Sequence, residues 1–355
     1  MTNQRHDRQS RLPGWNQERV TQASVIIVGM GALGNAVAQA LALAGVGRMM
    51  LCDGDTIELS NLSRTPLFVE ADIGRSKVEA AARALIKLAP DIQIETRALP
   101  LETGIGLGEL KAADLVLGCL DSRSARLELA GRCALVGVPW IDGATGQWSG
   151  GVRPWLDPNG PCFGCGMDDA SRAENDGQSS CRLPAEPHTA AATAPLSLLV
   201  GAHMALLALR FLMGLVVDGA IKVIDGASGL VSSVWQARDL GCPFHHPLPK
   251  ALEIDLSHRA TVGQLLALLG PGAVPLAWQP FQNHAHCRQC GYVDAHSTRT
   301  MQTNCAECGG ILHKQTHLEI DRAAPDTPLL ALGIPPSEIL AVREGAEIRY
   351  IQLTN

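Results

Sequence analysis

The stretch Ser24-Val-Ile-Ile-Val-Gly29-Met-Gly31-Ala-Leu-Gly34 decides the fold. Its first half is a short, apolar, β-branched run of the kind that forms a buried parallel strand. Its glycines have the spacing G-x-G-x-x-G, and an Ala/Leu-rich helix is predicted to follow over Asn35–Ala44. Gly45-Val-Gly47 ends that helix, and a second strand is expected at Arg48–Cys52, closing on Asp53. Strand, glycine turn, helix and strand together predict a βαβ unit.

Elements on either side extend this unit into an open α/β sheet. A further helix is predicted over Arg75–Leu88, because Pro90 stops it. Further strands are predicted at Ile92–Ala98, Ala113–Cys119, Ile221–Asp225 and Ser232–Ala237. We therefore expect a Rossmann-like, mostly parallel adenylation domain over residues 1–249, interrupted by a crossover loop at about 167–194. A smaller domain containing a zinc ribbon is expected over residues 250–355.

Composition excludes several classes of partner. The net charge of −6 and an aromatic content of 4% give no basic, base-stacking surface, so we expect neither nucleic acid nor anionic lipid as a partner. The N-terminal MTNQRHDRQSR has no apolar signal segment, and a cytoplasmic protein is expected. The apolar segment Leu196–Val217 contains His203 and Arg210, which favours a buried helix over a membrane span.

The glycine turn predicts phosphate binding at a helix N-terminus. Backbone N–H groups at Gly29, Gly31 and Gly34 can approach a phosphate there, and Asp53, 19 positions after Gly34, is placed to bind ribose hydroxyls. This motif alone fits an NAD-dependent dehydrogenase as well as an ATP-using enzyme.

Polar residues downstream favour ATP. A triphosphate needs cations for its oxygens, a carboxylate for Mg²⁺ and an amide to orient them. Each such residue could be an ordinary surface residue, but their combination is not expected of a dehydrogenase. The residues are Asp55, Asn61, Arg64, Lys77 and Asp121.

The order and spacing of these motifs resemble the ThiF/MoeB/E1 superfamily of enzymes that activate ubiquitin-like proteins. The resemblance covers residues 5–249, about two-thirds of the chain. The motifs are Arg5-His-Asp-Arg8-Gln9, GMGALG, Gly45-Val-Gly47 with Asp53-Gly-Asp55, Ser60-Asn-Leu-Ser-Arg64, Asp72-Ile-Gly-Arg-Ser-Lys77 and Leu120-Asp121-Ser122. His6 and Thr65 depart from the family, which usually has an aromatic residue and Gln there.

The resemblance implies a reaction and a set of roles. The C-terminal glycine carboxylate of a ubiquitin-like or sulfur carrier protein would attack the α-phosphate of ATP and displace pyrophosphate. Gly31 and Asp53 would hold the adenosine and ribose, and Asp121 would bind Mg²⁺. Asn61, Arg64 and Lys77 would contact the phosphates. Arg8 would reach the nucleotide site of a second subunit, which implies a homodimer.

The cysteine spacing predicts two zinc sites. Among the eleven cysteines, three CxxC pairs and one CxxH pair occur without an export signal, a pattern more typical of zinc ligands than of disulfides. By position in the family, Cys162/Cys165 and Cys242/His245 would form one site, with His246 as an alternative ligand to His245. The pairs Cys287/Cys290 and Cys305/Cys308 form a zinc-ribbon pattern.

Cys181 decides between two fates of the adenylate. Related enzymes carry a reactive cysteine in the crossover loop, which forms either a thioester with the activated partner or a link in sulfur transfer. Arg182 and His188 could lower its pKa, and an exposed cysteine without a role is the alternative. With a thioester at Cys181, the chain would pass its partner to an E2-like conjugating enzyme, as in short E1 enzymes of bacterial conjugation operons, some of them antiviral. We favour this hypothesis over adenylation of a sulfur carrier for thiamine, molybdopterin or related biosynthesis. A C-terminal domain that only recruits partners is a third hypothesis.

Overall fold

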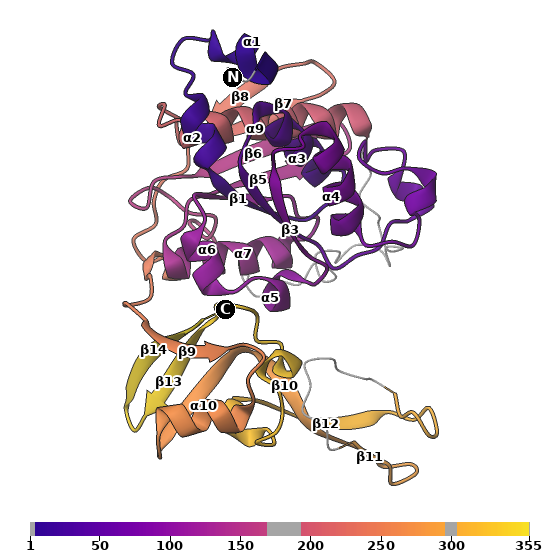
Figure 1. Cartoon of the computed structure of the whole chain (residues 1–355), viewed down its shortest axis with the longest axis vertical. Coiled ribbons are helices and arrows are strands. Elements are labelled where there is room, and N and C mark those ends of the chain that lie inside the picture. Colours follow the sequence, from indigo (N-terminus) through magenta and orange to yellow (C-terminus); the bar gives the residue numbers. More distant parts are fainter. Residues whose placement is uncertain (1–3, 169–192, 295–303, 355) are drawn as a thin grey trace. The chain divides into compact units, whose positions relative to one another are not determined.

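The computed structural model describes residues 4–168, 193–294 and 304–354. The chain divides into two compact units (Figure 1). The first unit comprises Met1–Leu101 and Leu110–Pro247, and the second comprises Glu102–Glu109 and Leu248–Asn355.

An eight-stranded sheet forms the centre of the first unit, in the order β3-β2-β1-β4-β5-β6-β7-β8. The strands β1 to β5 run parallel, and β6, β7 and β8 are antiparallel to their neighbours. This confirms the predicted mostly parallel α/β sheet. The strands are β1 (Ser24–Val28), β2 (Arg48–Cys52), β3 (Gln93–Arg97), β4 (Leu115–Gly118), β5 (Trp140–Thr145), β6 (Ser149–Trp155), β7 (Ile221–Asp225) and β8 (Val231–Val234).

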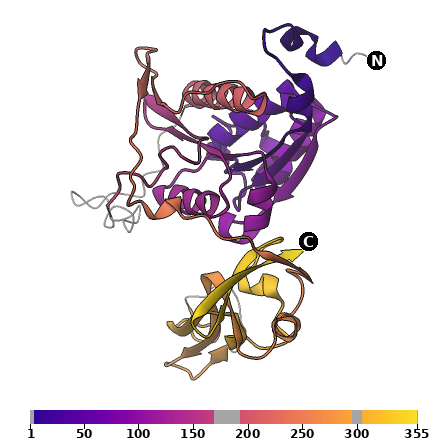
Figure 2. The same cartoon turned by 90° about the vertical axis from the view of Figure 1, so that its left-hand side faces the viewer.

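Helices cover both faces of this sheet (Figures 1 and 2). α3 packs against α4 and α9 on one face, and α7 lies on the other. The chain leaves β1 toward β2 and β3, then returns to place β4 on the other side of β1. Such a switch point is where ligands bind in open α/β sheets. The helices are α1 (Asp7–Ser10), α2 (Gln17–Gln22), α3 (Ala32–Ala44), α4 (Lys77–Leu88), α5 (Leu101–Gly104), α6 (Leu107–Ala112), α7 (Arg123–Val136) and α9 (Ala194–Leu212), with 3-10 turns η1 (Gln4–His6), η2 (Leu59–Asn61), η3 (Glu70–Asp72) and η4 (Pro243–His245).

α9 is the apolar helix expected from the sequence. In the described part of the chain, it alone is long and apolar enough to cross a membrane by length and composition. It packs against α3, β5 and β6, where Val200, Met204 and Ala208 are buried. These contacts are those of a core helix on a sheet.

The second unit is built on a six-stranded sheet. Its main order is β11-β10-β13-β14-β9, and β12 pairs with β10. The unit includes a segment from between β3 and β4: Leu107 N donates to the buried Glu338 carboxylate at 3.1 Å, and Gly108 N donates to Ser337 O at 2.9 Å. Its elements are β9 (Leu252–Ser257), α10 (Val262–Leu269), β10 (Ala273–Cys287), β11 (Val293–Asp294), β12 (Leu312–Glu319), η5 (Ile320–Arg322), η6 (Leu329–Leu332), β13 (Ile339–Glu344) and β14 (Glu347–Thr354).

Candidate nucleotide and metal sites

The glycine turn joins β1 to α3 through very close backbone packing. A Cβ on Gly34 would lie 1.9 Å from Gly29 O, so no other residue fits there without moving the helix. Asn35, on the first turn of α3, fixes the glycine turn by hydrogen bonds. Its Nδ2 donates to Met30 O at 2.9 Å and to Gly31 O at 3.1 Å, and its Oδ1 accepts from Leu67 N at 3.1 Å. Asn35 is fully buried, and we did not predict it as a site residue.

Gly31 differs from its two neighbours in the motif. It is the N-cap of α3 and has no side chain to cap the helix. A Cβ built on it would meet no described atom within 4 Å. The protein's own packing therefore does not require glycine here. A phosphate approaching the N-terminus of α3 does, since it would fill this space.

Asp53 connects the end of β2 to the glycine turn. Its Oδ2 accepts from Met30 N at 2.6 Å, and its Oδ1 accepts from Asp55 N at 2.8 Å. Burial raises the pKa of Asp53, while Lys77 and these two N–H groups oppose the rise. The carboxylate is thus held beside the turn, as binding of ribose hydroxyls requires.

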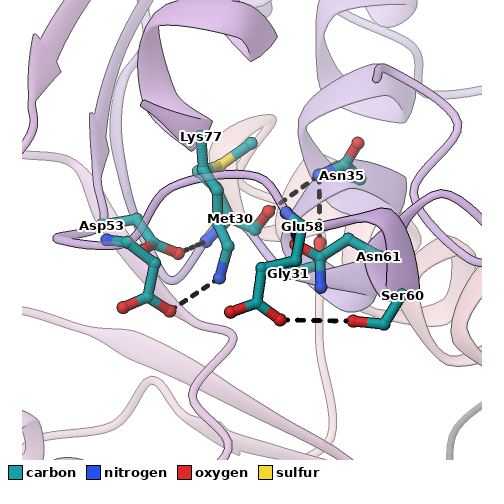
Figure 3. Close-up of polar contacts among 9 residues, drawn as sticks. Met30, Gly31, Asn35, Asp53, Glu58, Ser60, Asn61 and Lys77 are labelled. Carbon is teal, nitrogen blue, oxygen red and sulfur yellow. Dashed lines mark hydrogen bonds and ion pairs between the residues drawn. The ribbon is translucent and has the colours of Figure 1, made fainter. Parts of the chain in front are cut away.

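Figure 3 shows further polar side chains gathered around the Met30–Gly31 turn. Lys77, the first residue of α4, places its Nζ 2.7 Å from Asp55 Oδ2. Asn61 Oδ1 accepts from Glu58 N at 3.0 Å, and Arg64 Nη1 donates to Ser60 O at 2.7 Å. The structure therefore places Lys77 and Asn61 around the turn, and Arg64 bonds to the carbonyl of Ser60 beside Asn61.

Thr65, where the family usually has Gln, is buried behind this group. Its Oγ1 donates to Asn61 O at 2.9 Å, which fixes the backbone of Asn61. The departure from the family pattern thus falls on a supporting hydrogen bond.

Two further predicted residues, Asp121 and Arg8, are exposed. Asp121 is exposed three residues beyond β4, and Ser122 caps the N-terminus of α7. Arg8 is exposed on α1, an arm that Gln9 Nε2 anchors to Ala44 O at 2.7 Å. His6, where the family usually has an aromatic residue, is buried in this arm. Its Nδ1 lies 3.0 Å from Gln9 Nε2. Within the described ranges, neither Arg8 nor Asp121 has a side-chain hydrogen bond. Cys181 lies outside the described residues.

The first predicted zinc site is assembled from segments far apart in the chain. Cys162 Sγ lies 3.7 Å from Cys165 Sγ and 3.6 Å from Cys242 Sγ, and Cys165 Sγ lies 3.2 Å from His245 Nε2. Tetrahedral zinc with bonds near 2.3 Å to sulfur separates two sulfurs by about 3.8 Å. Burial and Arg238 lower the pKa of His245, which favours the neutral, ligating ring. The four residues fit a Cys₃His zinc site.

The second cluster consists of two similar turns in the second unit. Cys287 Sγ lies 3.5 Å from Cys308 Sγ, and Cys290 Sγ lies 3.5 Å from Cys305 Sγ. Gly291 (φ +76°) and Gly309 (φ +72°) follow the two CxxC pairs, and each donates its N–H to the first cysteine's carbonyl. This repeated geometry fits a Cys₄ zinc ribbon.

Comparison with known families agrees with this arrangement. Residues 5–243 match the ThiF family. The chain belongs to the ThiF family.

Its relatives are named as adenylyltransferases. The sulfur carrier protein ThiS adenylyltransferase of Escherichia coli K12 is 33% identical over 233 residues, which cover 64% of this chain and 87% of the relative. The molybdopterin-synthase adenylyltransferase of the same organism is 34% identical over 248 residues, or 67% and 94%. The ubiquitin-like modifier-activating enzyme 5 of Oryza sativa subsp. japonica is 34% identical over 166 residues, which cover 42% of this chain and 39% of the relative.

Solved structures show the same fold. E. coli MccB with ATP has a TM-score of 0.54 at 23% identity, covering 65% of this chain and 68% of MccB. MccB in complex with N-formylated MccA has a TM-score of 0.58 at 23% identity, covering 69% and 76%. The ThiF-family chain is thus an enzyme of the adenylyltransferase class with this α/β fold.

Gly31 and Gly34 should respond differently to the same substitution. Gly31→Ala adds a methyl group in open space, so we expect normal folding and an ATP Kd raised about tenfold by the clash with phosphate. Gly34→Ala places a methyl group against Gly29 O and should destabilise the fold by about 3 kcal/mol or more. Thermal unfolding with ATP titration measures both. Equal ATP affinity in Gly31→Ala and the wild type would contradict the proposed phosphate position.

Zinc content should depend on His245 but not on His246. Native mass spectrometry is expected to find two zinc ions per chain, one for each cluster. His245→Ala should lose one ion, because its Nε2 completes the first cluster. His246→Ala is the matched control and should keep both. A His245→Ala protein with full zinc content would show that another residue is the fourth ligand.

Proposed function

We propose that this ThiF-family chain uses Mg-ATP to adenylate the C-terminal glycine of a small ubiquitin-like or sulfur carrier protein. The observation that carries the proposal is the open space beside Gly31, near which Figure 3 shows Asp53, Lys77 and Asn61. In the reaction, a carboxylate oxygen forms a bond to the α-phosphorus, and the bond from that phosphorus to the β-phosphate oxygen breaks. Pyrophosphate leaves with the electron pair.

The chain's own residues bind and orient in this scheme. Lys77, Arg64 and Asn61 offer donors to the phosphate oxygens, where negative charge builds up in the transition state. Lys77 is held in position by Asp55 at 2.7 Å. Asp121 would bind Mg²⁺ through its exposed carboxylate, and the ion would offset phosphate charge. No general base is required, because the attacking carboxylate is already ionised at neutral pH.

The fate of the adenylate has two candidates. Adenylation of a sulfur carrier is favoured by the two relatives that are matched over 87% and 94% of their length. Formation of a thioester at Cys181, followed by transfer to an E2-like enzyme, is the second candidate. The match to a ubiquitin-like modifier-activating enzyme supports it over 42% of this chain. We favour the sulfur carrier as substrate on the longer matches.

A homodimer is part of the proposal. Large apolar side chains are exposed on α9, on the turn before β6 and around β8, among them Leu206, Trp148, Leu230 and Trp235, each at 59% exposure or more. Apolar surface of this kind marks contact sites. A second copy on this surface would bury it, and the exposed Arg8 of each copy would be available to the other.

Pyrophosphate exchange tests the reaction and Cys181 tests the fate of the adenylate. ATP–pyrophosphate exchange is expected only with a carrier that ends in a free glycine carboxylate, and an amidated carrier is the control. With a sulfur carrier as substrate and no sulfur donor in the assay, Cys181→Ala should leave exchange unchanged and no reducible adduct should form in the wild type. Exchange without any carrier contradicts the proposal, and a wild-type adduct that Cys181→Ala abolishes establishes the thioester instead.

Complementation between inactive subunits tests the role of Arg8. Arg8→Ala and Lys77→Ala subunits should each be inactive alone. If Arg8 acts in the other subunit's site, mixed dimers contain one intact site, and an equal mixture recovers about a quarter of wild-type exchange activity. Lys77→Ala mixed with Arg64→Ala is the matched control and should recover nothing. Absence of recovery in mixed dimers verified by two affinity tags would show that Arg8 acts within its own chain.

A further inference from the structure

The first unit contains a cavity that is separate from the candidate nucleotide-binding turn. Its volume is about 400 Å³, within the range of ligand pockets. Three arginines line it, Arg123 and Arg126 from the start of α7 and Arg153 from β6, together with the apolar side chains of Trp155, Phe163 and Met167. The cavity therefore combines a cationic wall with an apolar wall.

A buried carboxylate holds two of these arginines. Asp142 on β5 is fully buried, and Arg153 is its direct neighbour across the antiparallel pair β5–β6. Asp142 Oδ1 lies 3.2 Å from Arg126 Nε, and its Oδ2 lies 2.9 Å from Arg153 Nη1. Burial raises the pKa of Asp142, and the two guanidinium groups oppose the rise. Two guanidinium groups share one carboxylate, which leaves a positive charge at the cavity.

Donor groups at the cavity remain available. Arg153 donates a hydrogen bond to Asp142 through Nη1, and within the described ranges its Nε and Nη2 have no hydrogen bond. Trp155 is 6% exposed, and its buried Nε1 also has no partner in the described residues. A buried N–H without an acceptor costs about 1–3 kcal/mol, so an acceptor on a bound molecule would stabilise this arrangement. The available groups call for an anionic ligand that accepts hydrogen bonds.

The strand order places this cavity on the far side of Asp121 from the nucleotide. Along the sheet come β2 with Asp53, β1 with the glycine turn, β4 with Asp121 beyond its end, and then β5 and β6. Arg126 Nη2 donates to Leu120 O, the residue before Asp121. Strands are spaced by about 4.8 Å, so β4 and β6 are about 10 Å apart. An extended peptide covers that distance in about three residues.

We propose that this cavity binds an Asp or Glu side chain in the C-terminal tail of the carrier protein, about three residues before the terminal glycine. The inference rests on the proposed function, which places the reacting carboxylate near Asp121. Arg153 donates to the tail's acidic side chain, and Trp155 donates to a tail acceptor. Phe163 and Met167 pack against apolar atoms of the tail. The chain thus selects carriers by an acidic residue upstream of the glycine.

Peptide binding in the absence of ATP tests this inference separately from catalysis. The probes are fluorescein-labelled hexapeptides, Ala-Ala-Glu-Ala-Gly-Gly and its Gln counterpart, measured by fluorescence anisotropy at low salt with the full-length protein. The Glu peptide should bind about tenfold more tightly than the Gln peptide. In Arg153→Gln this difference should fall to within about twofold, while Arg153→Lys keeps part of it.

Controls separate recognition from folding. Arg153→Gln leaves Asp142 with one partner, so Asp142→Asn/Arg153→Gln, which removes the charge pair together, is the second variant and should also lose the discrimination. Cys165 of the first cluster also lines the cavity. Zinc content at the wild-type level would therefore show that the double substitution has left the fold around the cavity intact. Glu peptides with an amidated C-terminus should retain the preference over Gln.

Three outcomes would overturn the inference: equal binding of the Glu and Gln peptides, discrimination that survives in both variants, or a preference that disappears on amidation. The last would show that the cavity holds the terminal carboxylate itself. ATP–pyrophosphate exchange distinguishes these results from failure of the proposed function. Pyrophosphate exchange without a preference for Glu peptides would contradict the inference and support the proposed function. A preference for Glu peptides without exchange would contradict the proposed function and show that the cavity binds acidic peptides.

Discussion

The close approach of α3 to the end of β1 is the constraint on which the candidate nucleotide site depends. Gly34 lacks a Cβ, and the first turn of the helix therefore rests directly on Gly29 O. This contact fixes the direction of the helix N-terminus, and Asn35 ties the intervening carbonyls to it. Met30 N then faces Asp53, so β2 is tied to the same turn. A helix displaced by one methyl group would lose all three relationships together, because interiors are too densely packed to absorb the change.

Local patterns in the sequence predicted much of this arrangement, and tertiary contacts explain what they left out. β2 and β7 occupy the predicted residues, because each is a short run rich in apolar residues that stops at a turn residue, Asp53 after β2 and Gly226 after β7. The cation and amide set around Lys77 was predicted from its order along the chain. Asn35 was not, since an Asn inside an Ala/Leu-rich helix has no local signal; its partners Met30 O and Leu67 N are defined only once the turn has folded. Asp142 was missed for the same reason, because its partners come from α7 and β6.

The two predicted zinc clusters show how a spacing pattern can predict more than secondary structure. A CxxC pair already sets two sulfurs on one turn, so a metal needs only a second pair to close its shell. In the first cluster that second pair is 80 residues away along the chain, and Gln236 adds hydrogen bonds to Cys162 O and Cys165 O. The metal would therefore join the segment after β6 to the segment after β8. A bound metal that closes so long a loop removes more conformational entropy from the chain than one that closes the short loop of the second cluster.

The Asp142 ion pair is best understood as a positioning device for Arg153. A buried ion pair of this kind is weak support for stability, because taking the charges out of water offsets most of their attraction, and apolar residues of similar size often do as well. An apolar residue in place of Asp142 could not hold the Arg153 guanidinium at the border of the cavity with its Nε and Nη2 available to a ligand. Asp142 takes one edge of Arg153 from a fully buried position on β5, while Arg153 itself is one-third exposed. The buried Asp142 carboxylate thus holds the Arg153 guanidinium in place before a ligand arrives. This preorganisation lowers the entropy cost of binding a ligand carboxylate.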